Sequence, residues 1–275
     1  MNTIYFNIID MKKAIAIISF LIMGSFCYSQ DRYFSRTYTS AILPKGNFDI
    51  ELWHSSRFGH ETEYFHAMDQ RIEYEVGLGS NVQTAFYFNH FQKSVSDSNN
   101  VINQSVEIGF SNEWKFKITR PESKTVAAIY AELGIKGDEL ELESKFIVDR
   151  SFGKNVVALN LVYELEGEAQ RTKSSNRFQF GNNSIEFDAA FMHNCSSALG
   201  LGIEVVDHND IVYKRWTNSI LYAGPTLNYR NDKWFIVLNY LPQLINLYKT
   251  TASPKNKVLD EHERAEARII LGFSF

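Results

Sequence analysis

The chain has 275 residues, a formal net charge of −4 and 44% hydrophobic residues. This composition excludes a collagen-like or a disordered chain. Without a basic excess, no nucleic-acid partner is expected. The 21 Phe and 14 Tyr residues far outnumber the 5 Pro residues. That bias favours β-structure, because aromatic side chains fit the pleated surface of a sheet.

The N-terminus has the layout of a secretory signal peptide. From Met11 it reads "MKKAIAIISFLIMGSFCYSQ", with two lysines, an apolar run and small residues before Gln30. We expect residues 1–29 to be cleaved as a signal peptide, with Met11 as the true start. The alternative is a retained anchor, although the run is short for a helix that must cross about 30 Å of lipid. Cleavage would leave Cys195 as the one cysteine of the mature chain, so no internal disulfide is expected.

The rest of the chain alternates between apolar and polar residues. A period of two is typical of strands, because successive side chains point to opposite faces. In chain order, the alternating segments are "NFDIELWHSS", "RIEYEVGLG", "VQTAFYFNHF", "SVEIGFSNEWKFKI", "TVAAIYAELGI", "ELELESKFIVD", "NVVALNLVYELE", "SIEFDAAFMH", "ALGLGIEVV", "SILYAGPTLNYR", "KWFIVLNYLPQL" and "ARIILGFSF".

The connections between these segments alternate between short turns and mostly long polar loops, as in transmembrane barrels. We therefore predict an all-β fold for residues 47–275: a transmembrane, antiparallel up-and-down β-barrel of about 12 strands. A short periplasmic segment at residues 30–46 would precede it. A soluble β-sandwich or lipocalin-like barrel is the alternative. Its strands usually have about 5 or 6 residues, whereas strands of about 10 residues suit a membrane crossing.

The last residues indicate a strand that closes the barrel, because lipid cannot satisfy an open strand edge. Phe275, Phe273 and Leu271 share one face of it. This ending resembles the C-terminal aromatic signature that the bacterial barrel-assembly machinery recognises. The resemblance implies that machinery and outer-membrane lipid as partners, and the outer membrane of a Gram-negative bacterium as the location.

Several longer pieces resemble one family of Gram-negative outer-membrane barrels. They are "EWKFKI", "ELESKFIVDRSFGKNVVALNLVYE", "LYAGPTLNYR" with "YLPQL", and the final "ARIILGFSF". Members of that family are described as phenol meta-pathway degradation proteins or transporters. The resemblance covers about half of the mature chain and implies a porin-like barrel that helps a hydrophobic or small solute to cross. It brings no catalytic motif.

If the apolar residues face lipid, the alternate residues face the lumen, and acids outnumber bases among them. A water-filled lumen of this kind would favour cations. The pattern leaves open whether the pore is open or whether these charges pair across strands and plug it. The expected lumen-lining residues are Asp49, Glu51, Arg71, Glu73, Glu75, Glu107, Glu132, Glu141, Glu143, Lys145, Glu164, Glu186, Asp188, Glu204, Arg264, Glu266 and Arg268.

The segment "LWHSSRFG" places His54 and Ser56 on the outer face near the rim. This pair resembles the catalytic pair of outer-membrane phospholipase, in which a serine hydroxyl needs a base to attack an ester. That family continues with Asn-Gly, whereas Arg57 and Phe58 follow here, and no clear Asn is present to orient the imidazole. Polar rim residues are therefore the favoured interpretation.

The other histidines lack a metal-ligand spacing on one element, and no phosphate-binding loop is present. No metal and no cofactor are expected. The sequence as a whole predicts a passive channel or transporter for a small solute, with an acidic lumen and no enzyme activity. The alternatives are a non-conducting structural or partner-binding barrel and a phospholipase-like esterase that uses Ser56 and His54.

Overall fold

The computed structural model describes residues 32–275 except residues 121, 173–174, 213 and 250–254. The predicted signal peptide and the start at Met11 lie outside the described residues. No helix long and apolar enough to span a membrane occurs among them.

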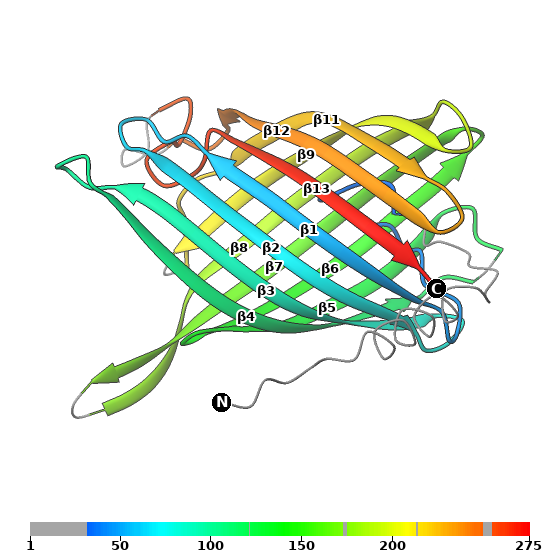
Figure 1. The fold of residues 1–275 in the computed structure, drawn as a ribbon, viewed down its shortest axis with the longest axis horizontal. Coiled ribbons are helices and arrows are strands. Elements are labelled where there is room, and N and C mark those ends of the chain that lie inside the picture. Colours follow the sequence, from blue (N-terminus) through cyan, green and yellow to red (C-terminus); the bar gives the residue numbers. More distant parts are fainter. Residues whose placement is uncertain (1–31, 121, 173–174, 213, 250–254) are drawn as a thin grey trace, which may run out of the picture.

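Twelve long strands and one strand of two residues make up the described chain (Figure 1). They are β1 (Phe48–Phe58), β2 (Phe65–Gly77), β3 (Val82–Ser96), β4 (Ile102–Lys117), β5 (Val126–Lys136), β6 (Glu139–Phe152), β7 (Asn155–Thr172), β8 (Ser175–Asn194), β9 (Leu199–Val212), the short β10 (Arg215–Trp216), β11 (Ile220–Arg230), β12 (Trp234–Asn246) and β13 (Ala265–Ser274).

The long strands form a closed antiparallel ring. Each pairs with its sequence neighbours, β9 pairs with both β8 and β11, and β13 pairs with β1 from Asp49↔Ser274 to Phe58↔Ala265. Closure leaves no long strand with a free edge, which a membrane-spanning sheet requires. The predicted fold of a twelve-stranded barrel is confirmed.

Polarity is inverted relative to a soluble protein. The apolar alternates are exposed on the outside, for example Ile72 at 52% and Phe110 at 61%, whereas Glu51 and Glu113 inside are 0% exposed. This pattern suits a barrel whose outer surface faces hydrocarbon.

The sequence predicted a long polar loop between the segments "NVVALNLVYELE" and "SIEFDAAFMH", and this prediction is wrong. β7 and β8 continue as a paired hairpin to Thr172 and Ser175, and Figure 1 shows this hairpin projecting beyond the barrel wall. Continued pairing satisfies backbone N–H and C=O groups that a loop would leave to water.

The segment that precedes β1 was expected in the periplasm, but its described residues 32–43 lie inside the barrel. Tyr38 packs in one cluster of buried residues with Trp53 of β1 and Tyr130 of β5. Phe34 packs in a second cluster with Val156 of β7 and Met192 of β8. Both clusters lie in the half of the barrel near the chain terminus Phe275, so the segment fills that half.

Candidate functional site

The predicted lumen residues fall into groups according to depth. Eight are nearly fully buried in the wall: Asp49, Glu51, Glu73, Glu75, Glu132, Asp188, Glu204 and Glu266, each at most 7% exposed. Seven others line the two larger cavities of the barrel: Arg71, Glu141, Glu143, Lys145, Glu164, Glu186 and Arg268. Glu132, Asp188 and Glu266 also reach these cavities. Glu107 and Arg264 are exposed, and Glu107 pairs with Lys136 at 3.6 Å.

Glu204 of β9 is the main anchor of the N-terminal segment. Its Oε1 accepts a hydrogen bond from the backbone N–H of Ser35 at 3.0 Å, and its Oε2 accepts from the N–H groups of Arg36 at 2.7 Å and Thr37 at 3.0 Å. The Asn239 amide donates to the same carboxylate at 3.3 Å. A carboxylate that accepts several N–H donors binds a backbone strongly, because charge-assisted hydrogen bonds are the strong ones.

Further wall side chains hold the next residues of the segment. The N–H of Tyr38 donates to Asn160 Oδ1 at 2.6 Å, and Asn160 Nδ2 donates back to the Tyr38 carbonyl at 3.0 Å. The N–H of Ser40 donates to Asp149 Oδ1 at 2.6 Å. The N–H of Leu43 donates to Gln83 Oε1 at 3.0 Å. Because these side chains come from β7, β6 and β3, the segment crosses the lumen from wall to wall.

Several of the acids around the segment are paired with cations. Arg32 lies 3.2 Å from Glu51, and its guanidinium stacks 4.1 Å from the Trp53 ring centroid. Lys145 contacts Glu143 at 3.0 Å and lies 4.2 Å from the centroid of the Tyr38 ring. Buried charges are tolerated when they are paired in this way. The half of the lumen near Phe275 is therefore filled by the described part of the segment and these paired side chains.

The opposite half of the barrel holds a chamber. A cavity of about 460 Å³ has Arg57, His208, Tyr222 and His262 in its lining. A second cavity of about 200 Å³ shares Arg36, Glu141, Glu164 and other lining residues with it and reaches Tyr38 and Trp53. A space beside the segment itself measures about 10 Å³ and is lined by Arg32, Tyr33, Phe34, Thr37, Tyr38, Thr39 and Lys115. The open space therefore ends at the N-terminal segment.

Opposite signs of charge face each other across this chamber. Arg57, Arg71 and Arg268 come from β1, β2 and β13. Glu141, Glu143 and Glu164 come from β6 and β7, which Figure 1 shows on the far wall of the ring from β1 and β13. The arginines have acidic partners, such as Asp69 at 2.9 Å from Arg57 and Glu266 at 3.2 Å from Arg268. The carboxylates of Glu141, Glu164 and Glu166 instead gather within 4.8 Å of one another.

The proposed pair of His54 and Ser56 is not assembled. Ser56 Oγ lies 2.7 Å from Nε2 of His66 on β2, whereas His54 Nδ1 lies 3.5 Å from Gln70 Nε2. Side chains on adjacent paired strands approach more closely than residues two apart on one strand. In the described part of the chain, His66 has no carboxylate partner that would orient its ring, as an activated serine requires.

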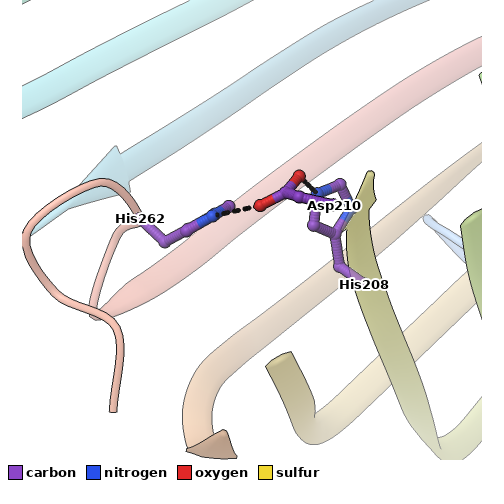
Figure 2. A group of neighbouring side chains, drawn as sticks. All are labelled: His208, Asp210 and His262. Atoms are coloured by element: carbon purple, nitrogen blue, oxygen red, sulfur yellow. Dashed lines mark hydrogen bonds and ion pairs between the residues drawn. The ribbon is translucent and has the colours of Figure 1, made fainter. Parts of the chain in front are cut away.

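A group of possible metal ligands escaped the sequence analysis. His208, Asp210 and His262 bring their ligand atoms within 4.8 Å of one another (Figure 2). His208 and Asp210 lie on one face of β9, but His262 lies 52 positions beyond Asp210. The spacing His208-x-Asp210 was the one local sign of this group in the sequence.

The residues of the expected assembly signal lie at the seam of the barrel. The Phe275 ring stacks on Phe48 with centroids 4.9 Å apart and planes at 10°. The two residues also exchange backbone hydrogen bonds of 2.9 and 3.2 Å. Phe273 is exposed on the outer face, and Leu271 is partly exposed there.

Solved structures with this fold are outer-membrane barrels. An outer-membrane channel from Pseudomonas putida F1 is 10% identical and aligns over 90% of this chain and 100% of its own, with a TM-score of 0.62. The NanC porin is 11% identical and aligns over 83% of this chain and 98% of its own, with a TM-score of 0.51. At these identities the likeness establishes the fold alone.

No curated protein sequence matches the chain. The model of one family, described as a family of unknown function (DUF6662), matches residues 27–275. The chain belongs to the family of unknown function DUF6662.

Proposed function

We propose that the protein is a passive outer-membrane channel for a small polar solute, narrowed by its own N-terminal segment. The observation that carries the proposal is the charged chamber of about 460 Å³ inside a closed barrel. Its size is in the range of small-molecule sites. The apolar outer face supports a location in the outer membrane, and short turns beside the C-terminus support a periplasmic position for that end.

The lining favours a hydrophilic solute over the hydrophobic one that the family resemblance allows. A solute that enters the chamber exchanges water for charged side chains. Glu141, Glu143 and Glu164 form an acidic wall, in which only Glu143 is paired with a lysine, Lys145, among the residues that the structure describes. The arginines opposite are already paired with acids. Low-dielectric walls focus the remaining negative potential, so cations or cationic groups are preferred.

Passage through the whole barrel requires the N-terminal segment to move. Residues 35–43 are held by hydrogen bonds to Glu204, Asn160, Asp149 and Gln83 rather than by covalent links. A segment held in this way can leave the lumen without disturbing the paired strands. The segment therefore acts as a gate that is closed while these hydrogen bonds are made.

The test is conductance of the purified, refolded barrel in a planar bilayer, under a salt gradient. Wild-type protein is compared with a variant that lacks residues 32–43. We expect rare or small current steps from the wild type and frequent, larger steps from the deletion variant. The sign of the reversal potential should show that cations pass in preference to anions.

Heat-modifiable migration on a gel checks that each variant is folded. Because the deletion also removes buried side chains, Glu204→Gln serves as a second variant that keeps the segment. A folded barrel that stays silent in all three forms would overturn the proposal. That result would favour the alternative of a non-conducting structural or partner-binding barrel.

A further inference from the structure

Three possible metal ligands meet at the mouth of the chamber. His208 and Asp210 are two residues apart on β9, so their side chains point to the same face of the strand. His262 comes from the connection that leads into β13 and reaches the same point from another side (Figure 2). The two imidazoles lie with ring centroids 5.6 Å apart.

The carboxylate of Asp210 lies between the two rings. Its Oδ1 is 2.9 Å from Nε2 of His208, and its Oδ2 is 2.8 Å from Nε2 of His262. Zinc bonds of about 2.0–2.1 Å in a tetrahedron place ligand atoms about 3.3 Å apart. The three ligand atoms here already lie within 4.8 Å of one another, so small side-chain rotations would suffice.

A second carboxylate orients one of the rings. Glu186 Oε1 lies 2.7 Å from Nδ1 of His208, on the side of the ring that faces away from Asp210. In metal sites, a carboxylate on the second nitrogen sets the tautomer and orientation of a ligating histidine. Asp210 is held as well, because Asn218 Nδ2 donates to its Oδ2 at 2.6 Å.

We propose that His208, Asp210 and His262 bind one divalent transition-metal ion, with Zn²⁺ as the best fit. Two imidazole nitrogens and one carboxylate oxygen suit zinc, whereas Ca²⁺ and Mg²⁺ require oxygen ligands. His208 and His262 both line the large cavity, so the fourth position of the ion opens to water in the chamber. Glu186 is a positioning residue.

An ion at this site would tie the connection before β13 to the wall strand β9. These two parts are separated in the ring by β11 and β12, so the ion would cross-link them at the mouth of the chamber. The site follows from side-chain geometry alone and does not depend on conduction through the barrel.

The experiment is calorimetric titration of ZnCl₂ into untagged, refolded barrel in detergent after treatment with a chelator. We expect one Zn²⁺ per chain. His208→Ala and His262→Ala should each weaken binding more than about 10-fold, and Glu186→Gln about 10–100-fold, as for other outer-shell partners. His193→Ala is the control, because His193 bonds to Asn155 at the far end of β8 and should bind zinc as the wild type does.

Thermal unfolding of the same proteins gives an independent readout. Zn²⁺ should raise the melting temperature of the wild type and of His193→Ala, but not that of His262→Ala, because a ligand stabilises only the state that binds it. CaCl₂ should not raise the melting temperature of any of these proteins. Absence of zinc binding by the folded wild type would overturn the proposal, and so would undiminished binding by both His208→Ala and His262→Ala.

Discussion

Ser35 and Glu204 are 169 positions apart in the chain, yet the backbone N–H of Ser35 donates to Oε1 of Glu204 at 3.0 Å. The same carboxylate also accepts from the two following amides. One side chain on β9 thus accepts hydrogen bonds from three successive backbone N–H groups of the segment. Without it, these N–H groups would be buried in the lumen without an acceptor. This contact fixes the position of the segment inside the barrel.

Replacing Glu204 with Gln should weaken the closed state. The amide NH₂ of Gln cannot accept hydrogen bonds, so some of the three backbone donors lose their acceptor. Loss of one charge-assisted bond costs about 1.5–3 kcal/mol, which corresponds to a shift of more than about 10-fold in the ratio of open to closed barrels. Single-channel open probability measures this shift. Glu107→Gln, on an exposed side chain near the rim, should leave it unchanged.

The acidic wall predicts which residues set ion selectivity. Exchanging Glu141, Glu143 and Glu164 together for Gln should move the reversal potential in a salt gradient toward zero, because all three side chains line the chamber and the exchange removes three negative charges from it. Glu107→Gln is the control. Glu107 is exposed near the rim and pairs with Lys136 at 3.6 Å, so its replacement should leave selectivity as in the wild type. Equal selectivity in the triple variant and the wild type would contradict this role for the wall.

Gly77 leaves room for the N-terminal segment to enter the barrel. A Cβ at Gly77 would lie 2.2 Å from the carbonyl oxygen of Pro44 and 2.4 Å from that of Leu43. Gly77→Ala should therefore displace these residues and expose the segment to added protease. Gly79→Ala has nothing within 4 Å of its new Cβ and should be cut no faster than the wild type. Time courses of limited proteolysis in detergent compare the two, and equal rates would argue against this close approach.

Phe275 should contribute to closing the barrel. Its ring stacks on Phe48 across the seam between the first strand and the end of the chain. Such a ring pair contributes about 0.5–1.5 kcal/mol beyond the area that it buries. Phe275→Ala should lower the urea concentration at the unfolding midpoint and the yield of folded barrel. Phe86→Ala, which removes an exposed outer ring at 55% exposure, should change both less.

We also propose that the barrel-assembly machinery engages β13 through Phe275, Phe273 and Leu271. Cells that express Phe275→Ala should then accumulate less barrel in the outer membrane than refolding in detergent alone would predict. Similar losses in cells and in detergent would assign the residue to barrel stability only.

The local alternation of apolar and polar residues was sufficient to predict the strands and to assign their outer and inner faces. Segments such as "RIEYEVGLG" alternate without interruption, and β2 places Ile72 outside and Glu73 inside as that alternation predicts. Closure also followed from sequence, because an unpaired strand edge is not stable in lipid. The hairpin of β7 and β8 was missed, since polar residues above the membrane are compatible with either a loop or paired strands.

The side-chain contacts of the candidate sites join residues that are distant in sequence. Nothing near Glu204 indicates that it accepts hydrogen bonds from Ser35, and nothing near Ser56 indicates that its partner is His66 on the next strand. His208 and His262 likewise come together only when the ring closes.

The sequence by itself determined an all-β barrel with an apolar exterior and a charged interior, because a period of two is a local property of the backbone. Only the tertiary structure decided that half of this interior is filled by residues 32–43 and that the other half is a chamber. The reason is physical: closure of the ring places side chains from strands far apart in sequence around one common space. Their charges then pair according to distance across that space rather than distance along the chain.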